Sequence, residues 1–90
     1  MLTQEEQQMA DASLKKEELV VGQWYKGLKV RVGNIACWDG QQFHYWRHKW
    51  GTWYMDTVNH FEDDNGYVLF FPIEAVDAPP HPMSYVHEEG

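Results

Sequence analysis

Residues 38–50 read Trp-Asp-Gly-Gln-Gln-Phe-His-Tyr-Trp-Arg-His-Lys-Trp, and this stretch decides the fold. Its Asp39-Gly40 dipeptide favours a tight β-turn, because both residues tolerate a positive φ. The residues after it alternate in a way that is typical of a β-strand. We therefore predict a hairpin turn at Asp39-Gly40 and a long strand from Gln41 to Trp50.

The predicted strand has two faces. One face carries Phe43, Tyr45, Arg47 and Lys49, and the other carries His44, Trp46, His48 and Trp50. We predict that the second set points toward the core and that the first set points outward. In the opposite arrangement, the recognition surface is to be sought around His44, Trp46 and His48.

Shorter apolar runs flank this hairpin and predict the rest of a sheet. They are Trp24-Tyr25, residues 30–37, Trp53–Val58 and Tyr67–Phe71. Asn65-Gly66 is a second turn signal, and Pro72 is expected to end the last strand because proline cannot donate to a β-ladder. Four or five strands with short connections predict a mainly β fold, an antiparallel meander bent toward a small SH3-like barrel.

The two ends of the chain differ from this β domain, which is expected to span residues 19–76. Residues 1–18 contain no glycine or proline, and Thr3 precedes Glu6 at the spacing of a capping box. A short acidic N-terminal helix is predicted there, with a solvated tail as the alternative. Residues 77–90 hold three of the four prolines and predict an irregular acidic tail.

Aromatic and basic side chains are concentrated between residues 19 and 61. This range holds ten of the fourteen aromatic residues, and five Lys or Arg residues against two carboxylates. Residues 62–90 hold seven carboxylates and no Lys or Arg. Fourteen rings exceed what one small core encloses, so we expect an exposed apolar patch and a homodimer, most simply a two-fold one.

The hairpin has the composition of a protein-recognition surface. Trp, Tyr and Arg dominate interface hot spots, because they bury a large area and keep polar tips. The predicted partner-binding residues are Phe43, Tyr45, Arg47, Lys49, Trp50 and Trp53, with acidic contacts from Glu62, Asp63 and Asp64. The alternative is a single-stranded nucleic-acid-binding module, in which bases stack on Tyr45 beside Arg47 and Lys49.

No motif in the sequence indicates an enzyme, a cofactor or a metal site. Cys37 lies in an Ile-Ala-Cys-Trp run, where it is expected to be a small buried hydrophobic residue. His44 and His48 would lie about 13 Å apart along an extended strand, too far to share one ion. The acidic run after His60 lacks the alternating oxygen ligands of a calcium loop. We predict a non-enzymatic protein.

The motif W-D-G-x-x-F-x-Y-W-R-x-K-W-G at residues 38–51 is followed by H-x-E-D-D-x-G-Y at residues 60–67. Together they resemble a group of small proteins encoded by tailed bacteriophages and prophages, over residues 22–72. The resemblance implies an inhibitor or adaptor of a bacterial host protein, such as a host-defence component. A single cysteine and an N-terminus without a signal-peptide pattern fit the reducing host cytoplasm.

Overall fold

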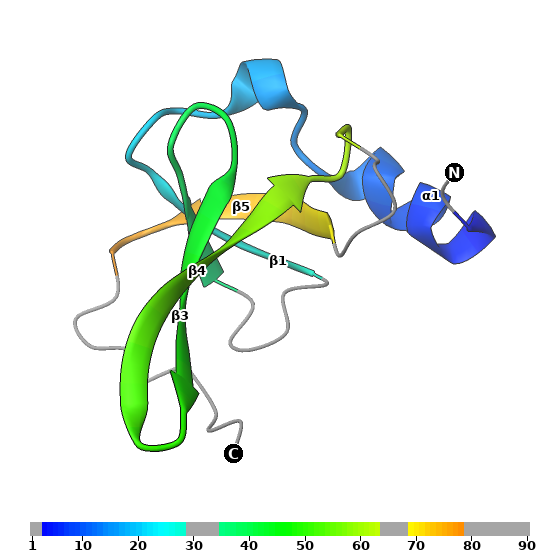
Figure 1. The fold of residues 1–90 in the computed structure, drawn as a ribbon. Coiled ribbons are helices and arrows are strands. Elements are labelled where there is room, and N and C mark those ends of the chain that lie inside the picture. Colours follow the sequence, from blue (N-terminus) through cyan, green and yellow to red (C-terminus); the bar gives the residue numbers. More distant parts are fainter. Residues whose placement is uncertain (1–2, 29–34, 64–68, 79–90) are drawn as a thin grey trace.

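The computed structural model describes residues 3–28, 35–63 and 69–78. Within these ranges the chain forms a helix, α1 (Gln4–Ala12), a 3-10 turn, η1 (Lys16–Glu18), and five strands (Figure 1). The strands are β1 (Trp24–Leu28), β2 (Ile35–Trp38), β3 (Phe43–Lys49), β4 (Thr52–His60) and β5 (Leu69–Val76). The predicted class, mainly β with a short N-terminal helix, is confirmed. Neither described helix is long and apolar enough to span a membrane.

The five strands close into a ring in the order β1-β2-β3-β4-β5, and β5 returns to pair with β1. The strand pairs are antiparallel except for β4 and β5, whose short parallel contact aligns Asn59 with Leu69. The meander pattern did not indicate this parallel pair, although simple geometry requires it. Strand directions cannot alternate all the way round a ring with an odd number of strands, so one neighbouring pair must be parallel.

β5 runs through Pro72, where the sequence predicted its end. The register between β1 and β5 shifts between Lys26 and Gly27, and Gly27 is the residue aligned with Pro72. Irregularities of this kind tolerate a proline, because they leave a position that need not donate to the ladder. The carbonyl of Pro72 accepts a hydrogen bond from the N–H of Leu14 at 2.7 Å, which ties the N-terminal segment to the strand.

Four residues, 39–42, join β2 to β3. Asp39 Oδ1 accepts hydrogen bonds from the backbone N–H groups of Gln41 and Gln42, at 2.7 and 2.8 Å. Of these four residues only the glycine has a positive φ. The hairpin predicted at Asp39-Gly40 is therefore present, but an aspartate-centred turn builds it instead of a two-residue turn.

The two-residue turn occurs instead at Trp50-Gly51, between β3 and β4. Lys49 pairs with Thr52, and the two residues between them have φ angles of 53° and 75°. Positive φ at both central positions is the requirement of a type I′ hairpin turn. Glycine meets it without strain, whereas a tryptophan is unusual there.

The core is built from the face of β3 that was predicted to point outward. Phe43 is fully buried and Tyr45 is only 5% exposed. The main buried cluster comprises Tyr25, Ala36, Trp38, Phe43, Tyr45, Val58 and Phe70. The inward orientation predicted for His44, Trp46, His48 and Trp50 was wrong: the first three are half-buried, and Trp50 is 80% exposed. The reason is cross-strand pairing, because Phe43 lies opposite the buried Trp38 and shares its face.

A smaller buried cluster joins α1 to the ring. It consists of Ala10, Phe61, Leu69 and Phe71, with Met9 packed against it. The helix predicted within residues 1–18 ends at Ala12. The hydroxyl of the next residue, Ser13, donates to the carbonyl of Met9 at 2.6 Å. Figure 1 shows α1 next to the ring, beyond the start of β5.

Several predicted features fall outside the described residues, among them residues 30–34 of the run predicted at 30–37 and the first two residues of the strand predicted at Tyr67–Phe71. Also outside are the Asn65-Gly66 turn and the part of the C-terminal tail after residue 78.

Candidate protein-binding surface

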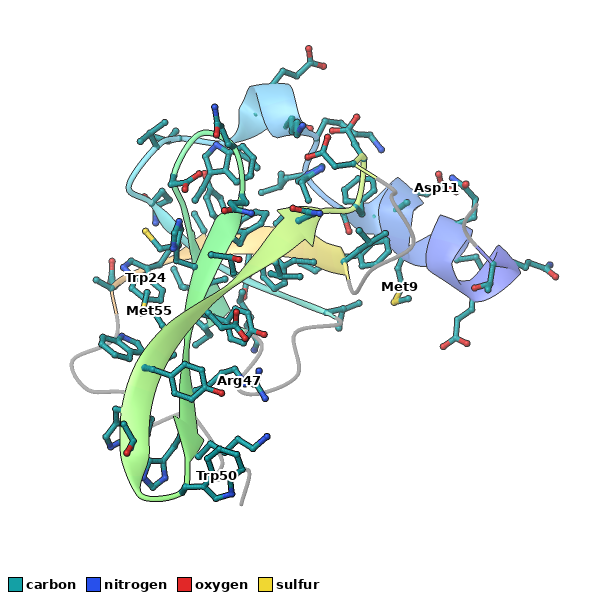
Figure 2. The ribbon with its side chains drawn as sticks, viewed as in Figure 1. Met9, Asp11, Trp24, Arg47, Trp50 and Met55 are labelled. Atoms are coloured by element: carbon teal, nitrogen blue, oxygen red, sulfur yellow. The ribbon has the colours of Figure 1, made fainter. Side chains whose placement is uncertain are left out.

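The outer side of the sheet carries large side chains that the core does not use. We define the outer aromatic face as Trp24, Trp46, His48, Trp53 and Met55. Trp46 lies opposite Met55, and His48 opposite Trp53, across β3 and β4. Trp24 of β1 lies on the same side of the sheet. It pairs with Cys37, and Cys37 pairs with His44, which shares its face of β3 with Trp46 and His48. Figure 2 shows Trp24 and Met55 on the same side of the molecule.

Ring stacking organises the outer aromatic face toward the end of the hairpin. The rings of His48 and Trp53 stack with centroids 4.5 Å apart and planes inclined by 23°. Both rings are half-buried, so each still presents surface to solvent. Aromatic side chains that are already ordered lose little conformational entropy when a partner binds.

Arg47 lies on the other side of the hairpin and makes contacts within the molecule. Its Nη1 donates to Asp56 Oδ2 at 2.8 Å, and its guanidinium carbon lies 5.6 Å from the centroid of the Tyr54 ring. The outward orientation predicted for Phe43, Tyr45 and Arg47 was wrong, because all three are buried. Buried side chains are not available for direct contact, so these three leave the candidate surface.

The other predicted partner-binding residues, Lys49, Trp50 and Trp53, lie at the end of the hairpin. Trp50 is 80% exposed, and Lys49 Nζ lies 4.7 Å from the centroid of its ring. Trp53 belongs to the outer aromatic face. Trp24 and Met55 were not among the predicted partner-binding residues. For Trp24 there was a signal in the sequence, because it precedes the buried Tyr25 in the strand and therefore points to the opposite face. Met55 could be found only after the β3–β4 register was known.

The acidic contacts predicted at Glu62 and Asp63 are engaged within the molecule. Glu62 Oε1 accepts a hydrogen bond from the backbone N–H of Lys16 at 2.7 Å. The ammonium group of Lys16 forms an ion pair with Asp63. The two carboxylates therefore fasten η1 to the end of β4, and Glu62 remains exposed. Asp64 lies outside the described residues.

His60 is fully buried, and both of its ring nitrogens have hydrogen-bond partners. Its Nε2 lies 2.9 Å from the carbonyl oxygen of Leu14 and donates to it, and its Nδ1 accepts from the N–H of Glu62 at 3.0 Å. Burial is the main cause that lowers the pKa of His60. Both ring nitrogens are engaged, which leaves no lone pair for a metal. Among the described residues, no three His, Cys, Asp or Glu side chains gather as a metal site.

The polar groups beside Cys37 do not activate it. Burial, and then the Asp39 carboxylate, raise the pKa of the Cys37 thiol, whereas a nucleophilic cysteine requires a lowered pKa. Asp39 itself accepts hydrogen bonds from the N–H of Gln42, from His44 Nε2 at 2.6 Å and from the N–H of Gln41, which lower its pKa to about 2. These contacts stabilise the turn before β3.

No protein-family model, curated protein or solved structure matches this chain. Its function is therefore inferred from the chemistry of its surface.

Proposed function

We propose that this protein is a non-enzymatic protein-binding module that recognises its partner through the outer aromatic face. One observation carries the proposal: Trp24, Trp46 and Met55 gather on the side of the sheet that faces away from a core already filled by other rings. Tryptophan and methionine are enriched in protein interfaces, because each buries a large apolar area when solvent is excluded. A contiguous exposed apolar surface is typical of an interaction site.

The partner that we propose is a bacterial protein. This part of the proposal rests on the resemblance of the motifs at residues 38–51 and 60–67 to those of small phage and prophage proteins, from which we infer that the chain acts in the cytoplasm of a bacterial host. There it would act as an inhibitor or adaptor, for example of a host-defence component. The half-buried tryptophans support a contact with a folded protein, since they offer flat apolar area together with indole N–H donors.

Single-stranded nucleic acid is the weaker candidate. Of the three residues that would form its stacking and cationic site, Tyr45 and Arg47 are buried. Lys49 alone remains, in a protein whose net charge is −7. A protein that neutralises several phosphates normally has a surplus of positive charge on its binding face.

The test compares two substitutions of nearly equal exposure in capture experiments from bacterial lysate. Met55 is 41% exposed on the outer aromatic face, and Ile73 is 37% exposed on β5. Met55→Glu should abolish capture of the protein that the wild type retains, and Ile73→Glu should leave it intact. Equal capture by both variants would overturn the proposal. Tight binding of a short oligonucleotide, with an affinity that falls steeply with salt, would favour the nucleic-acid candidate instead.

A further inference from the structure

The large hydrophobic residues with the greatest exposure in the described part of the chain form two separate sites. Trp50 is 80% exposed at the β3–β4 turn, and Val21 and Val20 are 67% and 62% exposed in the segment before β1. None of the three belongs to the outer aromatic face. Exposure of this degree, in side chains of this size, suggests that something covers both sites.

The first site, the tip, is Lys49–Gly51. Its tryptophan occupies a left-handed backbone position that asparagine, aspartate or glycine would fill with less strain. The ring projects into solvent with the Lys49 ammonium group near its face. Between Trp46 and Met55 the sequence has no carboxylate. The tip is therefore an aromatic knob with positive charge.

The second site, the valine platform, is formed by Val20 and Val21 and is preceded by the exposed carboxylates of Glu17 and Glu18. Hydrogen bonds hold this segment in place: the N–H of Val20 donates to the Tyr25 hydroxyl at 2.8 Å, and the N–H of the glycine after Val21 donates to a β2 carbonyl at 2.7 Å. The platform is thus an ordered apolar surface with negative charge beside it.

The two sites lie at opposite ends of β3. The valine platform contacts the turn before β3, because a Cβ placed on Gly40 would lie 3.4 Å from Val21 Cγ2. The tip begins at Lys49, the last residue of β3, which spans Phe43–Lys49. A strand of this length separates its two ends by about 20 Å, so the tip does not reach the platform of its own molecule. Figure 1 shows the β3–β4 turn and the segment after η1 far apart.

We propose that the tip of one molecule binds the valine platform of a second copy. Trp50 would pack on Val20 and Val21, while Lys49 faces the carboxylates of Glu17 and Glu18. One orientation of the two molecules satisfies both the apolar contact and the charge pairing. The tip provides an aromatic ring and a positive charge, and the platform provides an apolar surface and negative charge. Because the contact joins two different surfaces, it can repeat from copy to copy or close, and the smallest closed form is a two-fold dimer in which each tip binds the other copy's platform. The outer aromatic face stays free for another protein.

The experiment uses two half-defective variants and measures mass by sedimentation over a wide range of protein concentrations. Trp50→Asn removes the knob and keeps a residue that suits the turn. The double variant Val20→Ser, Val21→Ser removes the platform. The wild type should increase in mass with concentration, to a dimer or a larger assembly, and each variant alone should remain monomeric. Circular dichroism of both variants verifies that they are folded.

The decisive sample is an equimolar mixture of the two variants. The double serine variant still has a tip and Trp50→Asn still has a platform, so the mixture should form a heterodimer of twice the monomer mass and nothing larger. A wild type that stays monomeric, or a mixture that stays monomeric, would overturn the proposal. A wild-type assembly that each variant alone still forms would also overturn it. Lys49→Glu should weaken association, and adding Glu17→Lys should restore it, while Glu18 is kept because its carboxylate accepts a hydrogen bond from the N–H of Lys15.

Discussion

Tyr45 and Trp46 are neighbours in β3, and replacing each by alanine should have opposite consequences. Tyr45 points into the ring, where it packs in the main buried cluster and is 5% exposed. Trp46 points outward and lies opposite Met55. The pair therefore separates the contribution of the core from that of the surface at almost the same point along the chain.

The expected magnitudes differ several-fold. Truncation of a buried aromatic side chain to alanine costs about 3–5 kcal/mol. A domain of this size has a free energy of unfolding of about 5–13 kcal/mol, so Tyr45→Ala should remove a large part of it. The melting temperature should fall by about 15 °C or more. Trp46 is only half-buried, so Trp46→Ala should cost about 1 kcal/mol and lower the melting temperature by about 6 °C.

Thermal unfolding followed by far-ultraviolet circular dichroism measures both effects, and capture of the bacterial partner supplies the second readout. Trp46→Ala should lose the partner while it remains folded at room temperature. The reasoning would be refuted if Tyr45→Ala melted within a few degrees of the wild type while Trp46→Ala unfolded. That outcome would mean that the faces of β3 are exchanged.

Three further predictions test other parts of the fold. Gly27→Ala should prevent stable folding, seen as loss of the cooperative thermal transition, because the new Cβ would lie 2.3 Å from the Phe71 carbonyl oxygen. Arg47→Ala should lower the free energy of unfolding in a urea titration by about 2 kcal/mol, since it removes a buried side chain that pairs with Asp56 and lies beside the Tyr54 ring. Lowering the pH from 7.5 to 5.5 should destabilise the wild type: the folded-state pKa of His60 lies below its unfolded value, so the unfolded chain binds more protons as the pH falls through about 6.5.

Each of these predictions has a control. Gly22→Ala also adds a methyl group, two residues before β1, but its Cβ would meet no atom within 4 Å. Its φ of 87° strains an alanine, so this variant should fold with a lowered melting temperature but keep a cooperative transition. Arg47→Lys keeps the charge and should recover part of the loss. His60→Gln removes the titrating group, so its stability should fall less with acid than that of the wild type. If the variant showed the full acid dependence, His60 would not be its source.

The hairpin that dominates the sequence was predictable in outline, and so were the positions of its turns, but the conformation of the turns was not. Asp39-Gly40 predicted a two-residue turn. In the structure, Asp39 Oδ1 accepts hydrogen bonds from two backbone N–H groups, and these bonds stabilise a four-residue connection between β2 and β3 instead. The left-handed conformation of the turn at Trp50-Gly51 carries little sequence signal, because tryptophan is a poor residue for such a position. Its formation depends on the register of β3 and β4.

The pairing across the β2–β3 turn was enough to assign the two faces of β3. Residues paired across a β-turn share a face, so a buried Trp38 brings Phe43 into the core, and Tyr45 follows two residues later. Alternation alone does not indicate this, since both faces of β3 are rich in aromatic residues. For the candidate surface, Trp53 was within reach of the sequence, and Trp46 and His48 belong to the opposite arrangement that the sequence also allowed. The contribution of Met55 depends on pairing that forms only in the folded sheet.

The pairing of β1 with β5 also bears on how the protein is made. Trp24 lies opposite Val76, so the ring joins an early strand to the last one. While β5 is still inside the ribosome, the nascent chain can form only the antiparallel sheet of β1 to β4. This sheet has two unpaired edges, and it lacks the Phe70 ring that packs against Phe43. Open edges and uncovered aromatic rings promote aggregation. The protein is therefore most vulnerable during synthesis, and premature termination before Leu69 should yield an insoluble product.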